Sequence, residues 1–168
     1  MNIALIGMMG SGKSTIGKLL SDKLNFKFID TDEEIIKLAN CSINKIFEEH
    51  GEETFRSMET IVLSKILKSD NQIIATGGGI IKKEENKELL KQTKTLYLKA
   101  NKETIFERVK NDNSRPLLNT KNLKDTIQAI LSEREHLYEK SDLTINTTNK
   151  TPNEVVNTIM EEIKQWKK

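Results

Sequence analysis

The sequence predicts an α/β fold in which a five-stranded parallel sheet is flanked by helices on both faces. Two observations lead to this prediction. Short apolar runs of strand length alternate with longer segments of helical periodicity along the whole chain, and such alternation is typical of parallel sheets. The first apolar run also leads through a glycine-rich turn into a helix. With 168 residues, the chain is expected to form a single domain over 1–168.

The individual elements follow from local signals. The stretch Thr-Asp-Glu-Glu from Thr31 predicts a capping box at a helix start. Thr151, Pro152 and Glu154 predict the start of the last helix. The predicted strands span residues 2–6, 26–30, 72–75, 94–99 and 143–145. Helices are predicted after the glycine-rich turn, from Thr31, over about 42–49, 53–67, 102–110 and 126–138, from Pro152, and as a charged segment after Gly79.

The turn after the first strand matches a phosphate-binding loop. Residues 7–15, Gly-Met-Met-Gly-Ser-Gly-Lys-Ser-Thr, fill every fixed position of Gly-x4-Gly-Lys-Ser/Thr. Its glycines let backbone N–H groups close around phosphate oxygens, and the following helix adds the positive end of its dipole. Lys13 is expected at the β- and γ-phosphates, and Ser14 as a Mg²⁺ ligand. The residues expected to bind the nucleoside triphosphate here are Gly10, Ser11, Gly12, Lys13, Ser14 and Thr15.

Two further polar segments follow the second and third strands, at the same predicted edge of the sheet. Asp30 is expected to hold Mg²⁺ through water, and Asp32 to accept a proton from a substrate hydroxyl. Both acids could instead only cap the next helix and complement its dipole. Gly77, Gly78 and Gly79 fit either a close approach to an anion or an ordinary tight turn.

Composition narrows the class of partner. The formal net charge is +2 and 31% of residues are charged, so we expect neither nucleic acid nor a membrane as partner. The single cysteine, Cys41, excludes an internal disulfide and favours a reducing cytoplasm. The apolar N-terminus lacks a basic segment and is expected to be a strand rather than a signal peptide. No apolar run approaches the roughly 18 residues of a membrane span.

Arginine use singles out four positions. Only four of the 27 basic residues are arginines. Lysine suffices wherever a plain positive charge is needed, whereas a guanidinium binds carboxylate or phosphate in a bidentate manner. The alternative is four surface salt bridges of little energetic weight. The arginines are Arg56, Arg108, Arg115 and Arg134.

Six motifs make the chain resemble the shikimate kinases, a family with the fold of the nucleoside-monophosphate kinases. They are the loop 7–15, Asp30-Thr31-Asp32, Gly51-Glu52-x-x-Phe55-Arg56, Gly77-Gly78-Gly79, Arg115-Pro116-Leu117-Leu118 and Arg134-x-x-Leu137-Tyr138. The resemblance runs nearly end to end. It implies phosphorylation of the shikimate 3-hydroxyl by ATP, giving 3-phosphoshikimate and ADP in aromatic amino-acid biosynthesis. It also implies Mg²⁺ as cofactor, and nothing in the sequence demands more than a monomer.

The resemblance also implies roles for residues on the acceptor side. Arg56 and Arg134 would clamp the shikimate carboxylate, helped by the backbone N–H groups of Gly78 and Gly79. Asp32 would bind the ring hydroxyls and is the candidate base. These residues would serve a substrate-binding segment over about 31–60.

On the nucleotide side, the resemblance implies a mobile lid over about 111–124. Arg115 would come from this lid to the phosphates. Arg108 would stack near adenine, with residues 147–152 on its other side. Two departures from the family pattern are Ala75, where many phosphate-loop enzymes have an aspartate, and Glu135-His136, where the family often has a proline.

Two alternatives remain at this point. One is another small-molecule kinase of the same fold, acting on gluconate or a nucleotide, although few aromatic residues near 31–60 are available to stack on a base. The other is a GTP-binding switch. Asn149-Lys150-Thr151 partly matches a guanine-reading motif, but Pro152 occupies its acidic position.

Overall fold

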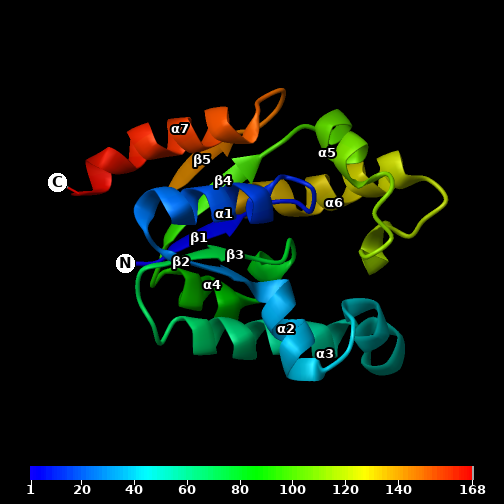
Figure 1. Cartoon of the computed structure of the whole chain (residues 1–168). Helices are drawn as coiled ribbons and strands as arrows, with labels where there is room; N and C mark the ends of the chain where they lie inside the picture. The colour runs from blue at the N-terminus through cyan, green and yellow to red at the C-terminus, as the bar shows by residue number, and fades with distance from the viewer. Residues whose placement is uncertain (168) are drawn as a thin grey trace.

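One parallel sheet forms the centre of the molecule (Figure 1). The computed structural model describes residues 1–167, and within them five strands follow the order β2-β3-β1-β4-β5. In register, Ile3 lies opposite Ile73 on one side and Lys94 on the other. The fold class and all five predicted strands are confirmed. The strands are β1 (Ile3–Ile6), β2 (Lys27–Asp30), β3 (Gln72–Ala75), β4 (Lys94–Lys99) and β5 (Leu143–Asn146).

Helices connect the strands and cover both faces of the sheet (Figure 1). The long helix α3 contains Gly51 at φ 78° and ψ 170°, so it consists of two helices that meet at this residue, as the sequence predicted. The helices are α1 (Lys13–Leu24), α2 (Thr31–Ala39), α3 (Ile43–Ile66), α4 (Glu84–Leu90), α5 (Lys102–Val109), α6 (Leu123–Tyr138) and α7 (Pro152–Ile163). Short 3₁₀ helices are η1 (Ile80–Lys82), η2 (Pro116–Leu118) and η3 (Lys164–Lys167).

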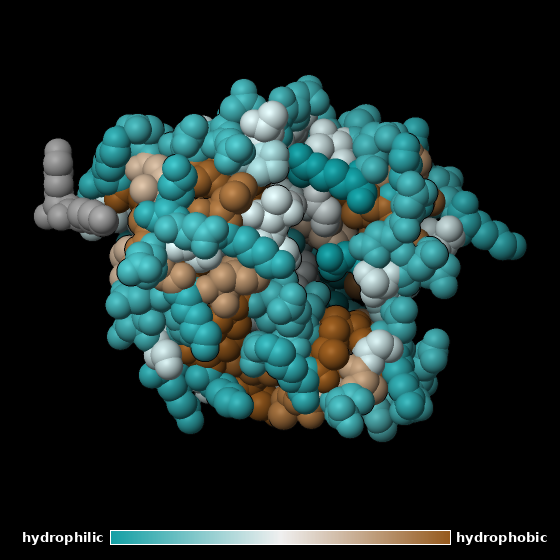
Figure 2. All heavy atoms as spheres, in the orientation of Figure 1, coloured by the Kyte–Doolittle hydropathy of each residue, from teal (hydrophilic) through white to brown (hydrophobic). Residues whose placement is uncertain are grey.

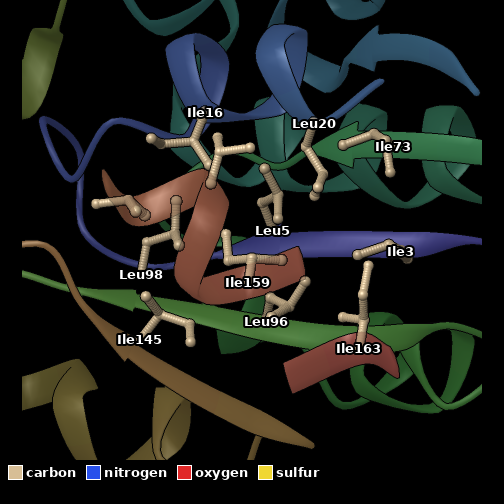
Figure 3. Packing of buried hydrophobic residues seen from close by; sticks show 12 residues of the cluster. Ile3, Leu5, Ile16, Leu20, Ile73, Leu96, Leu98, Ile145, Ile159 and Ile163 are labelled. Carbon is tan, nitrogen blue, oxygen red and sulfur yellow. The ribbon is translucent and has the colours of Figure 1, made fainter. Parts of the chain in front are cut away.

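The core has two sides because successive strand residues point to opposite faces. Leu5 and Leu96, both fully buried, face α1 and α7, where they meet Leu20 and Ile159 (Figure 3). On the other face, buried strand residues pack against α3, α4 and α6. The residues of that second cluster are Ala4, Ile6, Leu63, Ile80, Ile81, Leu90, Tyr97 and Tyr138.

Two predicted helix starts differ in the structure. The predicted capping box at Thr31 is wrong, because Asp30 is the N-cap of α2 and its side chain accepts from the backbone N–H groups of Asp32 and Glu33. Helix α6 begins at Leu123, three residues before the predicted start, because the Asn122 side chain caps it.

The start of α7 agrees with its prediction. Thr151 and Glu154 form a complete capping box, and Pro152 is the first helical residue. The box satisfies backbone N–H groups that no residue within the helix can bond.

The surface is mostly hydrophilic, with apolar side chains gathered over α2 and α3 (Figure 2). Three apolar residues of these two helices are exposed: Ile36, Leu38 and Ile61. In the part of the chain that the structure describes, no helix is both long and apolar enough to cross a membrane. The loops after β1 and β3 and the start of α2 meet at the carboxyl edge of the sheet, where open α/β sheets bind ligands.

Candidate active site

Two glycines give the phosphate-binding loop its backbone conformation. Gly10 and Gly12 have φ values of 78° and 96°, which only glycine adopts without strain. Gly12 is the N-cap of α1 and provides no side-chain cap, so the first N–H groups of that helix are available to a ligand. The Lys13 ammonium donates to the carbonyls of Gly7 and Met8 at 2.8 and 2.9 Å.

The protonation of Lys13 depends on the charges around it. Its side chain is buried, and burial together with the nearby Arg115 lowers the Lys13 pKa to about 7, while Asp32 and Asp30 oppose the shift. A phosphate group beside this ammonium would stabilise its charged form.

The Asp30 carboxylate makes contacts through both of its oxygens, so capping of α2 does not exclude the predicted role at Mg²⁺. Its Oδ2 accepts from Ser14 Oγ at 2.6 Å, while Oδ1 caps α2. The cap therefore fixes the carboxylate in place and leaves it beside the start of α1. A hydroxyl and a carboxylate together offer the hard oxygen ligands that Mg²⁺ prefers.

A first cavity, of about 560 Å³, runs along this loop. Arg108 lines this cavity and donates through Nη1 to the Gly10 carbonyl at 3.1 Å and through Nη2 to the Thr147 carbonyl at 3.3 Å. Thr147, Lys150 and Pro152 of the 147–152 segment line the same cavity as Arg108, while stacking of Arg108 near adenine stays a prediction. All the residues predicted to bind the nucleotide line this cavity: Gly10, Ser11, Gly12, Lys13, Ser14, Thr15, Arg108 and Arg115.

A second cavity, of about 290 Å³, lies next to the first. It brings together every residue predicted for the acceptor, from three helices (α2, α3 and α6) and the glycine loop after β3. The two cavities share Asp30, Asp32 and Arg115 in their linings. The acceptor residues in the second cavity are Asp32, Arg56, Gly78, Gly79 and Arg134.

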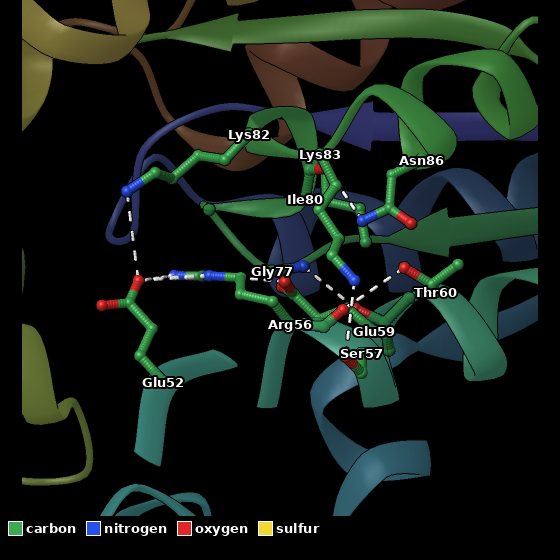
Figure 4. A network of polar contacts seen from close by, with 12 residues as sticks. Glu52, Arg56, Ser57, Glu59, Thr60, Gly77, Ile80, Lys82, Lys83 and Asn86 are labelled. Atoms are coloured by element: carbon green, nitrogen blue, oxygen red, sulfur yellow. Dashed lines mark hydrogen bonds and ion pairs between the residues drawn. The ribbon is translucent and has the colours of Figure 1, made fainter. Parts of the chain in front are cut away.

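Two glutamates hold Arg56 in place (Figure 4). Arg56 Nη1 donates to Glu59 Oε2 at 2.7 Å, and Nη2 to Glu52 Oε1 at 3.0 Å. Glu59 is fully buried, and burial raises its pKa while Arg56 opposes that shift. Sequence reasoning missed Glu59, although its spacing of three residues from Arg56 on one helix was a usable signal.

Arg134 is the second buried guanidinium of this cavity. It is 2% exposed, and its Nε and Nη1 have no hydrogen-bond partner among the described residues. Buried polar groups are seldom left unpaired, and a carboxylate is the acceptor that a guanidinium binds most strongly. Glu133 Oε2 is 3.9 Å from Nε, too far for a hydrogen bond, so these N–H groups can still bind an anionic ligand.

A side chain on the first or third residue of the triple glycine would displace charged side chains of the site. A Cβ on Gly77 would lie 2.7 Å from Glu59 Oε1 and 2.9 Å from Asp32 Oδ1, and a Cβ on Gly79 would overlap the Arg56 guanidinium. The N–H of Gly77 donates to Thr31 Oγ1 at 2.9 Å. Gly77 and Gly79 thus lie against charged side chains of the site, which supports the prediction of a close approach at this turn.

Asp32 lies between the two cavities. Burial and the neighbouring Asp30 raise the Asp32 pKa, and Arg115 and Lys13 oppose the rise. Its Oδ1 is buried without a hydrogen-bond partner, and its Oδ2 is 3.8 Å from Arg115 Nη1. Arg115 also pairs with Asp112 at 3.3 Å, so its guanidinium lies near both carboxylates.

The two departures from the family pattern leave these groups in position. Glu135 and His136 lie within α6, which continues to Tyr138, and Glu135 pairs with Lys99 at 2.8 Å. Ala75 is the last residue of β3 and is opposite Asp30 in the sheet. Asp30 therefore lies next to the position where the acid is missing.

Comparison with known proteins agrees with this geometry. A sequence model of the shikimate kinase family matches residues 9–164. A shikimate kinase of Thermodesulfovibrio yellowstonii is 43% identical over 162 residues, covering 96% of this chain and 94% of that protein. The structure of a shikimate kinase from Acinetobacter baumannii in complex with shikimate has a TM-score of 0.95 at 35% identity, covering 98% of this chain and 93% of that chain.

A more distant structure shares the fold alone. The thymidylate kinase of Candida albicans has a TM-score of 0.65 at 21% identity, covering 99% of this chain and 92% of that one. The family match thus favours shikimate over the alternative acceptors. The chain belongs to the shikimate kinase family, whose activity is the ATP-dependent phosphorylation of shikimate in the shikimate pathway.

Proposed function

We propose that this chain transfers the γ-phosphoryl group of ATP to the 3-hydroxyl of shikimate at the point where its two cavities meet. The observation that supports this most directly is the shared lining of Asp32 and Arg115. One cavity contains the phosphate-binding loop and the other contains two buried arginines. A phosphoryl group on the first side therefore faces an acceptor on the second.

On the acceptor side, Arg56 and Arg134 clamp the shikimate carboxylate. Both guanidiniums are buried, and the N–H groups of Gly78 and Gly79 complete an anion site from the backbone. Phosphoryl transfer depends mostly on positioning and charge neutralisation. A rigid clamp on the carboxylate sets the ring hydroxyls against Asp32, at the boundary with the nucleotide cavity.

At the reacting atoms, Asp32 accepts the proton of the 3-hydroxyl. The oxygen then bonds to the γ-phosphorus, the bond from that phosphorus to the bridging oxygen breaks, and ADP leaves. The raised pKa of Asp32 suits a base that must hold a proton. Lys13 and Arg115 neutralise the charge that develops on the transferred group and the leaving group.

Mg²⁺ fits beside these residues. The Ser14 hydroxyl would hold it directly and Asp30 through water, as the chemistry of this oxygen pair allows. When bound, the ion neutralises phosphate charge.

The chain forms a single domain over 1–168. Within it, residues 111–124 serve as a lid and residues 31–60 as the acceptor-binding segment. Arg115 comes from this lid and reaches both cavities. Because both cavities are built from one chain, we propose that it works as a monomer. The single free cysteine, Cys41, suits the cytoplasm.

The function is tested by ADP release from MgATP with shikimate, gluconate, thymidine monophosphate or no acceptor. Shikimate alone is expected to stimulate turnover. Stimulation by another acceptor would overturn the arginine clamp, and GTP turnover without any acceptor would favour a switch.

The role of Asp32 needs its own variant. Asp32→Asn keeps the shape of the side chain and removes its basicity, so kcat should fall by about 10²–10⁴-fold, the usual contribution of a positioned base. An unchanged kcat with a raised KM for shikimate would leave Asp32 as a binding group and reject it as the base.

A further inference from the structure

Two stacked tyrosines lie behind the triple glycine. Tyr138 is the last residue of α6 and Tyr97 is in β4, and their rings stack at 5.1 Å between centroids with an interplanar angle of 25°. Tyr138 is fully buried and Tyr97 is 1% exposed. Both rings therefore contribute alike to the core on this face of the sheet.

Their hydroxyls differ. The Tyr138 hydroxyl donates to the carbonyl of Gly78, 60 residues away in sequence. The Tyr97 hydroxyl is buried and has no hydrogen-bond partner among the described residues. Burying a hydroxyl costs free energy unless it forms a hydrogen bond. The hydrogen bond of Tyr138 therefore distinguishes two residues that are otherwise matched.

That bond acts on a peptide unit of the acceptor site. The carbonyl of Gly78 and the N–H of Gly79 belong to the same planar trans peptide and point in opposite directions. An anchor on the carbonyl therefore fixes the direction of the Gly79 N–H. The carbonyls of Gly77 and Gly79 accept instead from the backbone N–H groups of Ile80 and Lys82.

The Gly78–Gly79 peptide needs such an anchor because glycine restricts its rotation so little. Three consecutive glycines have wide conformational freedom, and a peptide between two of them can rotate at little steric cost. Tyr138 also lies one helical turn after Arg134 on α6, and the Arg134 guanidinium is near enough to oppose the rise of the Tyr138 pKa, which burial takes to about 12. The phenol thus stays protonated and remains a donor.

We propose that Tyr138 is a positioning residue for the acceptor: its hydroxyl fixes the Gly78–Gly79 peptide so that the Gly79 N–H points at the substrate carboxylate. This inference rests on the proposed function. One helix, α6, then provides both Arg134 and the anchor of the backbone donor, so that the two halves of the carboxylate site move together.

The test compares Tyr138→Phe with the matched control Tyr97→Phe. Each variant removes one buried hydroxyl and keeps its ring in the stack. Loss of a net hydrogen bond of about 0.5–1.5 kcal/mol corresponds to roughly a two- to tenfold change. For Tyr138→Phe we expect KM for shikimate to rise by about that factor, with KM for ATP unchanged. Tyr97→Phe should leave both KM values unchanged.

The outcomes separate the inference from the function on which it rests. If the wild-type chain turns over shikimate and the two variants have equal KM values for shikimate, the inference is overturned and the proposed function stands. A parallel rise of KM for both substrates, together with a lower melting temperature in Tyr138→Phe alone, would make the hydroxyl merely structural and would also overturn it. Absence of shikimate-dependent turnover in the wild-type chain would overturn the proposed function itself, and the inference with it.

Discussion

Replacing Arg56 by methionine should damage stability and activity through different partners. Arg56 is 8% exposed and donates at 2.7 Å to Glu59, which is fully buried. Breaking a buried pair by removing one partner costs about 3–5 kcal/mol. At about 2–4 °C per kcal/mol for a domain of this size, the melting temperature should fall by roughly 6–20 °C.

The loss of activity comes from the substrate carboxylate. Each charged hydrogen bond contributes about 1.5–3 kcal/mol, and 1.4 kcal/mol is tenfold. The value of kcat/KM for shikimate should therefore fall by roughly tenfold to over a hundredfold in Arg56→Met.

A second substitution separates the two effects. In Arg56→Met/Glu59→Leu, apolar side chains replace the whole buried pair, which is often neutral for stability. The double variant should regain most of the lost melting temperature in a thermal denaturation assay, while kcat/KM for shikimate stays low. If activity returns together with stability, Arg56 does not bind the substrate and the reasoning is refuted.

The pH dependence adds a further check on Arg56→Met. Burial raises the pKa of Glu59 above its usual 4.5 in the folded chain, and loss of Arg56 removes the charge that opposes the rise. The folded variant then binds a proton more strongly than the unfolded chain, so its stability falls as pH rises above about 4.5. The deficit in melting temperature should shrink between pH 7.5 and pH 5.5, and a deficit that stays constant over this range would argue against a buried, unpaired Glu59.

Three other predictions concern the nucleotide, the glycines and the lid. The Lys13 pKa is lowered to about 7 in the free chain, and a bound phosphate would raise it. ATP binding should therefore take up a proton at pH 8 and hardly any at pH 6. Titration calorimetry in buffers of different ionisation enthalpy measures this proton uptake, and equal uptake at the two pH values would contradict the prediction. Gly79→Ala should raise KM for shikimate by roughly tenfold or more, since its methyl displaces Arg56, and normal kinetics would show that the guanidinium has room to move. Hydrogen exchange in residues 111–124 should slow when ATP and shikimate are both present; identical protection with and without them would reject the lid.

Local chemistry made much of this protein predictable from its sequence. The phosphate-binding loop depends on glycines and a lysine within nine residues, and the start of α7 on a cap completed within four. Such features form between neighbours in the chain, so spacing alone specifies them. The alternation of apolar strands and helices determined the sheet in the same way.

Contacts between distant residues required the tertiary structure. Asp30 caps α2 and also bonds Ser14, which displaced the capping box predicted at Thr31. Spacing placed Glu59 near Arg56, but only the fold buries its carboxylate and brings it against Gly77. The bond from Tyr138 to Gly78 joins residues 60 positions apart. Periodicity and spacing describe neighbours along the chain, whereas burial and charge pairing depend on which elements pack together, and that was decided by the fold.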